Sequence, residues 1–209
     1  MNDFPHIGIA GNIGVGKTTL CEKLAEIFSL EPIYESVIDN PYLSDFYDDM
    51  DRWSFNLQVY FLYHRFSSQI KLSNIKKGFI QDRTIYEDKE IFARNLKDHS
   101  HMSDRDWETY KNLFDNMTQF IREPDLIIYL KANTDNLISR IKNRDREFEK
   151  DISSEYIHSL NVYYNKWISK IDDEKVLIID TNNFNIFKDT IMFDDMKNKI
   201  VNKLICNVK

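Results

Sequence analysis

Residues 11–18 read GNIGVGKT and fit the pattern GxxxxGK[ST]. This stretch follows an apolar run, His6–Ala10 (HIGIA), that predicts a buried strand, and it opens a helical pattern over Lys17–Phe28. Glycines let backbone N–H groups approach phosphate oxygens closely, and the N-terminus of a helix adds a partial positive charge. In this context we expect Lys17 to reach the β- and γ-phosphates and Thr18 to bind Mg²⁺. The stretch therefore predicts a strand–loop–helix unit that binds a nucleoside triphosphate.

Outward from this loop, short apolar runs alternate with longer helical patterns. The runs that predict strands are His6–Ala10, Glu31–Glu35 (the weakest), Gly78–Asp82, Asp125–Leu130 and Lys175–Asp180. The predicted helices are Lys17–Phe28, Arg52–Lys71, one that starts at Ser103, Thr134–Asn143, Ser153–Ile171 and one from about Phe187 or Asp189 towards Leu204. Continuous apolar strands separated by helices favour a parallel sheet covered on both faces. We therefore expect a three-layer α/β fold with a five-stranded parallel sheet.

Composition and charge limit the class of protein. The 209 residues suit a single domain over residues 1–209, and 42% hydrophobic residues suffice for a core, which excludes a disordered chain. The net charge of −6 argues against nucleic acid as a partner. The two cysteines have no metal-binding spacing, the start lacks signal-peptide features, and no apolar stretch is long enough to span a membrane. These features favour a cytoplasmic protein with no membrane partner.

The third predicted strand narrows the kind of reaction. It ends in Asp82-Arg83 rather than the Asp-Glu of remodelling ATPases, and the chain lacks the NKxD motif of GTPases. A small-molecule kinase remains, with a nucleoside or a nucleoside monophosphate as acceptor. A hydroxyl acceptor benefits from a carboxylate that takes its proton. Glu35, at the end of the second predicted strand, is the candidate, although a surface glutamate before a turn also fits the local pattern.

Five segments, in a common order, resemble a known family. They are GNIGVGKTT (11–19), ESVIDNPYL (35–43), RWSFNLQVYFLYHR (52–65), QDRTIYEDKEIFARNL (81–96) and RIKNRDREFE (140–149). With them the chain resembles the deoxyribonucleoside kinase family, and within it the bacterial deoxyadenosine kinase-like branch. The resemblance implies a P-loop kinase fold with a short arginine-rich lid at about residues 140–152.

The resemblance also implies roles for individual residues. Glu35 matches the general base toward the sugar 5′-OH, Arg83 matches the arginine that holds the 5′-oxygen, and Lys17 completes the catalytic set. The residues implied to bind ATP are Gly11, Asn12, Gly14, Gly16, Lys17, Thr18, Thr19, Arg140, Arg144 and Arg146. The residues implied to bind the nucleoside are Glu35, Tyr47, Gln58, Arg65, Arg83, Asp88, Phe92 and Glu149. Thr18 and Asp82 are implied as ligands of Mg²⁺.

Helical spacing alone gives a less specific interpretation of two of these groups of residues. Gln58 and Arg65 share a helix face, and either a ligand or buried structural partners would satisfy their polar groups. Arg140 and Arg144 also share a face, which fits a phosphate site or a solvated helix end.

The implied reaction is transfer of the γ-phosphate of ATP, with Mg²⁺, to the 5′-OH of deoxyadenosine or another purine deoxynucleoside. The amide of Gln58 and the carboxylate of Asp88 could pair with cytosine as well as with adenine. A pyrimidine-preferring kinase is therefore an open alternative. A thymidylate-like monophosphate kinase stays open too, although Glu35 and Glu149 would repel an acceptor phosphate. A third alternative is a regulatory protein that binds ATP without phosphoryl transfer. Family analogy further implies a homodimer through Arg52–Lys71 and the next long helix.

Overall fold

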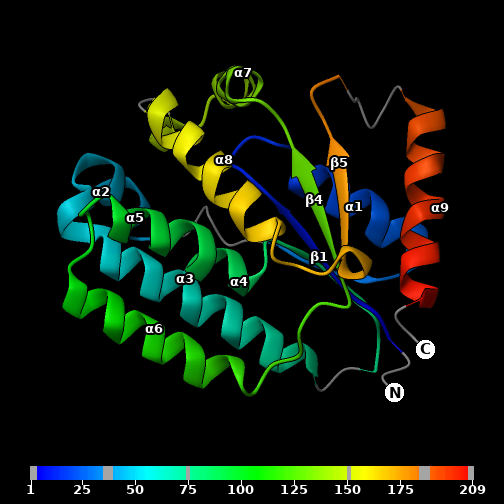
Figure 1. The fold of residues 1–209 in the computed structure, drawn as a ribbon, viewed down its shortest axis with the longest axis horizontal. Coiled ribbons are helices and arrows are strands. Elements are labelled where there is room, and N and C mark those ends of the chain that lie inside the picture. Colours follow the sequence, from blue (N-terminus) through cyan, green and yellow to red (C-terminus); the bar gives the residue numbers. More distant parts are fainter. Residues whose placement is uncertain (1–3, 35–39, 74–75, 150–151, 184–188, 207–209) are drawn as a thin grey trace.

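The centre of the protein is a five-stranded parallel sheet, as the sequence predicted (Figure 1). The strands lie in the order β2-β3-β1-β4-β5. The structure is a computed structural model that describes residues 4–34, 40–73, 76–149, 152–183 and 189–206. The strands are β1 (His6–Gly11), β2 (Glu31–Ile33), β3 (Phe79–Asp82), β4 (Leu126–Lys131) and β5 (Val176–Asp180). The strand with the weakest sequence pattern, β2, is the shortest and lies at one edge of the sheet.

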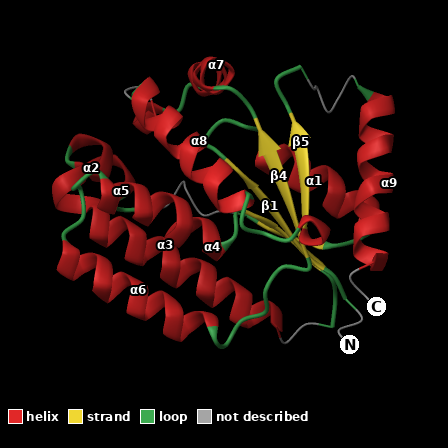
Figure 2. Ribbon diagram, viewed as in Figure 1, coloured by secondary structure: helices red, strands yellow, loops and turns green. Residues whose placement is uncertain are grey.

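Helices surround the sheet (Figure 2). They are α1 (Lys17–Phe28), α2 (Leu43–Asp48), α3 (Met50–Ser73), α4 (Ile85–Glu87), α5 (Arg94–Asp98), α6 (Asp104–Thr118), α7 (Thr134–Arg144), α8 (Ser154–Ile168) and α9 (Thr190–Cys206). A π-helical turn, η1 (Asp88–Ala93), joins α4 to α5, and 3₁₀ turns occur at η2 (Glu147–Glu149) and η3 (Asp173–Lys175). All predicted helices are present with ends shifted by a few residues, whereas α2 and the stretch from α4 to α5 were not predicted. No helix in the described ranges combines the length and apolarity needed to cross a membrane.

Alternate residues of β4 fill the two sides of the sheet. Leu126, Ile128 and Leu130 enter one core with side chains of α1 and α9. Ile127 and Tyr129 enter the opposite core, which is closed by α8. Successive side chains of a strand point to opposite faces, so a strand that is apolar throughout must be covered on both. The apolar run of β4 is therefore the local cause of the three-layer arrangement.

A third cluster of apolar side chains lies among α2, α3, α5 and α6. Helices α3 and α6 run side by side in this part of the molecule (Figure 1). The start of α6 was predicted from Ser103, and the Ser103 hydroxyl accepts a hydrogen bond from the N–H of Asp106 at 3.1 Å. Helices α2 and α3 of this layer form one wall of the cavity that lies at the carboxyl ends of the strands.

The strand order opens a crevice at the carboxyl edge of the sheet. The chain runs from β1 to β2 and β3 on one side, and then to β4 and β5 on the other. Such a reversal is where ligands bind in open α/β sheets. Ile9 of β1 pairs with Asp82 of β3, so the loop after β1 and the end of β3 meet at this edge.

Candidate active site

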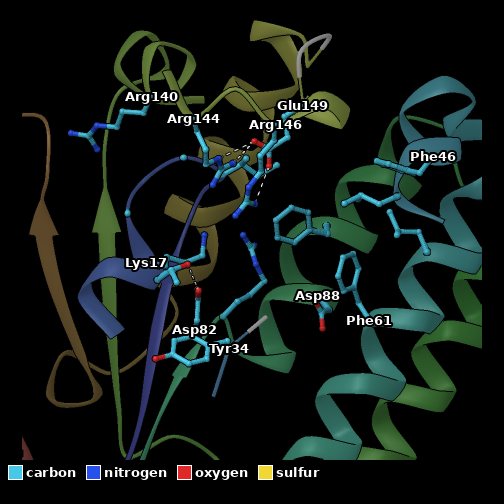
Figure 3. Close-up of a pocket in the computed structure, with 18 of the residues that line it drawn as sticks. Lys17, Tyr34, Phe46, Phe61, Asp82, Asp88, Arg140, Arg144, Arg146 and Glu149 are labelled. Carbon is cyan, nitrogen blue, oxygen red and sulfur yellow. Dashed lines mark hydrogen bonds and ion pairs between the residues drawn. The ribbon is translucent and has the colours of Figure 1, made fainter. Parts of the chain in front are cut away.

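One cavity of about 520 Å³ lies at the carboxyl edge of the sheet (Figure 3). Its lining includes the predicted site residues Gly14, Gly16, Lys17, Thr18, Thr19, Tyr47, Gln58, Arg65, Asp82, Arg83, Asp88, Phe92, Arg140, Arg144, Arg146 and Glu149. Gly11 and Asn12 lie at the end of β1 and in the loop behind this lining. Glu35, the predicted general base, lies outside the described residues.

The phosphate loop holds its shape through left-handed glycines. Gly14 and Gly16 have φ angles of 80° and 103°, which L side chains rarely adopt. Gly16 precedes α1 without a side-chain cap, so the first N–H groups of the helix remain available for an anion. Lys17 is buried, and its Nζ donates to the carbonyl of Asn12 at 3.1 Å. The loop thus presents backbone donors and one cation to the cavity.

The Asn12 side chain turns away from the cavity toward α8. Its Nδ2 donates to the carbonyl of Ile157 and to Oδ1 of Asn161, both at 2.9 Å. Its Oδ1 accepts from the N–H of Ile13 at 2.7 Å. Asn12 therefore anchors the phosphate loop to α8, and any contact with ATP falls to its backbone.

Thr18 and Asp82 place two oxygen-bearing side chains beside Lys17. The Thr18 hydroxyl donates to Asp82 Oδ2 at 2.5 Å. The other carboxylate oxygen, Oδ1, is buried and has no hydrogen-bond partner among the described residues. A buried carboxylate oxygen without a donor fits a cation such as Mg²⁺, which one or two carboxylates and substrate phosphates hold in proteins. The described residues contain no cluster of three or more His, Cys, Asp or Glu side chains for a metal, so phosphate and water oxygens would complete the shell.

Arg83 is held rigidly at the end of β3. Its backbone is left-handed, with φ of 68°, and its N–H donates to the carbonyl of Ile9 at 3.0 Å. A left-handed non-glycine residue costs about 1–3 kcal/mol and is typical of functional sites. The guanidinium carbon lies 4.3 Å from the centroid of the Phe92 ring, and Nη1 donates to the Tyr164 hydroxyl at 2.8 Å. The sequence identified Arg83 and Phe92 but not Tyr164.

A polar stripe on α3 lines the far end of the cavity. Gln58 and Arg65 are both buried, and both line the cavity from α3. Arg65 Nε donates to Asp88 at 2.5 Å, and its Nη1 donates to the carbonyl of Arg83 at 3.5 Å. Gln58 Oε1 is buried with no hydrogen-bond partner in the described part of the chain. Burying an unpaired acceptor costs about 1–3 kcal/mol, so Gln58 indicates a polar ligand at this end.

The structure brings together two of the three predicted lid arginines. Arg144 donates to Glu149 from Nε at 3.0 Å and also from Nη2, and Arg146 Nη1 lies 3.5 Å from the same carboxylate. Arg140 points the other way (Figure 3), and its guanidinium donates to the backbone carbonyl and hydroxyl of Thr181. Partial burial lowers the pKa of the Arg140 guanidinium below its usual value. Arg140 thus joins the phosphate loop to the end of β5, apart from the Arg144–Glu149 cluster.

Apolar and aromatic side chains complete the lining. They are Ile13, Tyr34, Leu43, Phe46, Leu57, Phe61 and Tyr156, together with the acidic Glu22. Leu57 and Phe61 lie beside Gln58 on α3, so the helix face that identified Gln58 was also the signal for them. Tyr34 and Tyr156 carried no signal, because each reaches the cavity from an element end that no periodicity marks. At the α3 end of the cavity, the apolar side chains beside Gln58 suit a flat heterocycle.

Known proteins match most of the chain. A sequence model of the deoxynucleoside kinase family matches residues 7–206. Deoxyadenosine/deoxycytidine kinase from Bacillus subtilis is 38% identical over 205 residues, or 97% of this chain and 94% of that relative. Deoxyadenosine kinase from Dictyostelium discoideum is 45% identical over 166 residues, or 79% of this chain and 67% of that relative.

A solved structure shows the same fold. Deoxyadenosine kinase from M. mycoides with bound dATP superposes with a TM-score of 0.80 and 28% identity, over 92% of this chain and 99% of that one. The phosphate loop, the parallel sheet and the extent of these matches agree, and the chain belongs to the deoxynucleoside kinase family.

Proposed function

We propose that this protein transfers the γ-phosphate of ATP to the 5′-OH of a deoxyribonucleoside, with deoxyadenosine or another purine deoxynucleoside preferred. The observation that supports this most strongly is the cavity at the carboxyl edge of the sheet. It is lined by the phosphate loop and by the Gln58, Arg65 and Asp88 side chains, and so offers a phosphate site and a heterocycle site in one space. Membership in the deoxynucleoside kinase family agrees with that chemistry.

The donor half would bind ATP through the phosphate loop. Lys17 and the open N–H groups of α1 would hold the β- and γ-phosphates. Thr18 and Asp82 would hold Mg²⁺, which when bound neutralises charge on those phosphates. Arg144 and Arg146 would add positive charge from the lid side, where Glu149 already gathers them.

The acceptor half would bind and activate the 5′-OH. Glu35 is assigned as general base because, at the start of the ESVIDNPYL segment (35–43), it matches the general base of the family. It would take the 5′-OH proton as that oxygen attacks the γ-phosphorus in line, while ADP leaves. Arg83 would hold the 5′-oxygen, and Tyr47 and Glu149 would position the sugar. The carboxylates of Glu35 and Glu149 disfavour an acceptor that already carries a phosphate.

The base end suits adenine. A carboxamide pairs in two places with the N6 amine and N7 of adenine, which would supply the donor that Gln58 Oε1 lacks among the described residues. Guanine presents the O6 acceptor in place of that amine. The cytosine N4 amine offers a similar donor, and the relative from Bacillus subtilis is named for both deoxyadenosine and deoxycytidine. Deoxycytidine is therefore the second candidate acceptor.

A product assay tests the proposal. The purified protein is incubated with Mg·ATP and, separately, with each of the four deoxynucleosides and their monophosphates, and phosphorylated products are quantified. We expect product from deoxyadenosine above all, and none from monophosphates. Product only from a monophosphate would overturn the acceptor assignment, and ATP binding without any product would favour a regulatory role.

Two variants of α3 test the base contact. Gln58→Leu removes the carboxamide from the cavity, and Gln69→Leu makes the same change at a buried glutamine of the same helix outside the cavity lining. We expect kcat/KM for deoxyadenosine to fall about 10- to 100-fold in the first variant only. Equal losses in both variants would show that Gln58 has a structural role.

We also propose a homodimer in the cytoplasm. Tyr63 on α3 and Leu113 on α6 are 58% and 40% exposed, which supports an interface across these two helices. Light scattering on the purified protein measures the oligomeric state, and a monomer would contradict the proposal. ATP as phosphate donor supports the cytoplasmic setting.

A further inference from the structure

Glu87 is a fully buried carboxylate that is not part of the cavity lining. Its Oε1 accepts from the N–H of Thr84 at 2.8 Å and from the Thr84 hydroxyl at 3.3 Å, which caps α4. Its Oε2 accepts from the Tyr164 hydroxyl at 2.7 Å and from the N–H of Gly11 at 3.2 Å. A cap requires only the first of these oxygens, so the contacts of Oε2 call for a separate explanation.

The Oε2 contacts join two parts of the candidate active site. Gly11 is the first residue of the phosphate loop motif. Tyr164 donates to Glu87 and accepts from Arg83 Nη1 at 2.8 Å, so it forms a bridge between the carboxylate and the guanidinium. The direct distance from Arg83 Nη1 to Glu87 Oε2 is 3.9 Å. The loop that would hold the donor phosphates and the arginine that would hold the 5′-oxygen thus share one carboxylate.

The bridge is rigid. The Tyr164 ring stacks on Tyr129 with centroids 5.6 Å apart and planes 14° apart, and it meets Phe92 edge-on at 6.5 Å. Phe92 in turn lies under the Arg83 guanidinium. Burial raises the pKa of Tyr164 well above its usual value, so the phenol keeps the proton that it donates to Glu87. The hydroxyl therefore stays in a fixed orientation, in which it can accept from Arg83.

The energetics also favour a functional role. A buried carboxylate is costly unless donors surround it, and a core position of this kind is usually apolar. Glu87 is stabilised by two backbone N–H groups, by the Tyr164 hydroxyl and by the nearby Arg83 cation. Two of these groups, the Gly11 N–H and the Arg83 guanidinium, belong to the candidate active site.

We infer that Glu87 and Tyr164 are positioning residues that lock the Arg83 guanidinium in register with the phosphate loop. This inference rests on the proposed function, because it takes Arg83 as the group that holds the 5′-oxygen. Glu87 acts at the loop through Gly11 and at Arg83 through the Tyr164 hydroxyl. Without the hydroxyl, the guanidinium would close the 3.9 Å gap to Glu87 and move away from the acceptor.

Tyr164→Phe tests the inference with a matched control. It removes one hydroxyl and leaves the stacked ring. The control is Tyr163→Phe on the same helix, where the lost hydroxyl donates to Asp98 at 2.8 Å and lies outside the cavity lining. We expect kcat for deoxyadenosine to fall about 10- to 100-fold in Tyr164→Phe, with KM for ATP nearly unchanged, and no such fall in the control. Equal kcat values in both variants would overturn the inference.

A double-mutant cycle separates positioning from a structural role. Arg83→Lys removes the guanidinium that Tyr164 is inferred to hold. We expect Tyr164→Phe to have little further effect on kcat in the Arg83→Lys background, because both changes disrupt one interaction. Additive losses would show that Tyr164 acts independently of Arg83 and would overturn the inference.

Glu87→Gln is the complementary variant. Either orientation of the carboxamide sets its NH₂ group against a backbone N–H, that of Thr84 or that of Gly11, so we expect a kcat loss at least as large as in Tyr164→Phe. Wild-type kcat in Glu87→Gln would contradict the role of the carboxylate. If wild-type protein phosphorylates no deoxynucleoside, the proposed function fails. If it does and the tyrosine variants behave alike, the positioning role alone fails.

Discussion

Replacing Asp88 by leucine is expected to destabilise the fold, because it removes one half of a buried ion pair. Arg65 Nε donates to the Asp88 carboxylate at 2.5 Å, and the two side chains are 6% and 2% exposed. The guanidinium would stay buried near Phe61 without this carboxylate. Removing one partner of a buried pair costs about 3–5 kcal/mol. At about 2–4 °C per kcal/mol for a domain of this size, Tm should fall by about 6–20 °C.

The double variant Arg65→Met with Asp88→Leu separates stability from substrate binding. Apolar side chains of similar volume remove both charges, and such replacements of buried pairs are often neutral or stabilising. We expect Tm to recover most of the loss. The cavity has nevertheless lost two charged hydrogen-bonding groups at its base end, so kcat/KM for deoxyadenosine should remain at least about 100-fold below wild type while ATP binding persists.

Thermal unfolding and steady-state kinetics on the variants give both quantities. Asp115→Leu is the control, since it breaks an exposed ion pair with Lys89 at 2.7 Å and should cost about 1 kcal/mol or less. A Tm of Asp88→Leu equal to that of Asp115→Leu would refute the stability argument. A double variant with wild-type kcat/KM would refute the assignment of this end to the base.

Three further predictions concern the base, the metal and acid sensitivity. Glu35→Gln is expected to lower turnover by about 10²–10⁴-fold with ATP affinity retained, because the carboxylate would act only on the 5′-OH proton; unchanged turnover would remove that role. Asp82→Asn should raise the Mg²⁺ concentration needed for half-maximal rate, and an unchanged requirement would place the cation elsewhere. Burial lowers the pKa of His6 from 6.5 to about 4, so between these pH values the unfolded chain binds a proton that the folded protein does not. Stability should therefore fall from about pH 6.5 down to about pH 4, by about 3 kcal/mol in total. Urea unfolding at pH 7 and at pH 4.5 should show a smaller loss in His6→Gln, and an equal loss would exclude His6 as the cause.

Local sequence patterns predicted those elements whose signals lie within a few residues of one another in the sequence. The GNIGVGKT stretch (11–18) marks the end of one strand and the start of α1. Ser103 marks the start of α6 through a contact three residues away. Family motifs then named side chains from five separate segments, and the fold places nearly all of them around one cavity. Their individual roles stay predictions that the variants above test.

Long-range contacts set the features that no local pattern predicted. The Arg140 guanidinium points away from Arg144 and Arg146 because it donates to Thr181, which is 41 residues away in sequence. Tyr164 reaches Glu87 across 77 residues. The π-helical turn at Asp88–Ala93 breaks the regular 3.6-residue period, so the sequence pattern did not indicate a helix there. These features depend on how the elements pack and not on the residues next to them.

The position of the transferred phosphate tests the central claim most directly. The protein is incubated with Mg·ATP and either deoxyadenosine or 2′,5′-dideoxyadenosine, which lacks the 5′-OH, and products are identified by mass spectrometry and ³¹P NMR. The account predicts a 5′-monophosphate from deoxyadenosine and no product from the analogue, which should instead compete with deoxyadenosine. Phosphorylation of the analogue, or a phosphate on the 3′-oxygen of deoxyadenosine, would contradict it.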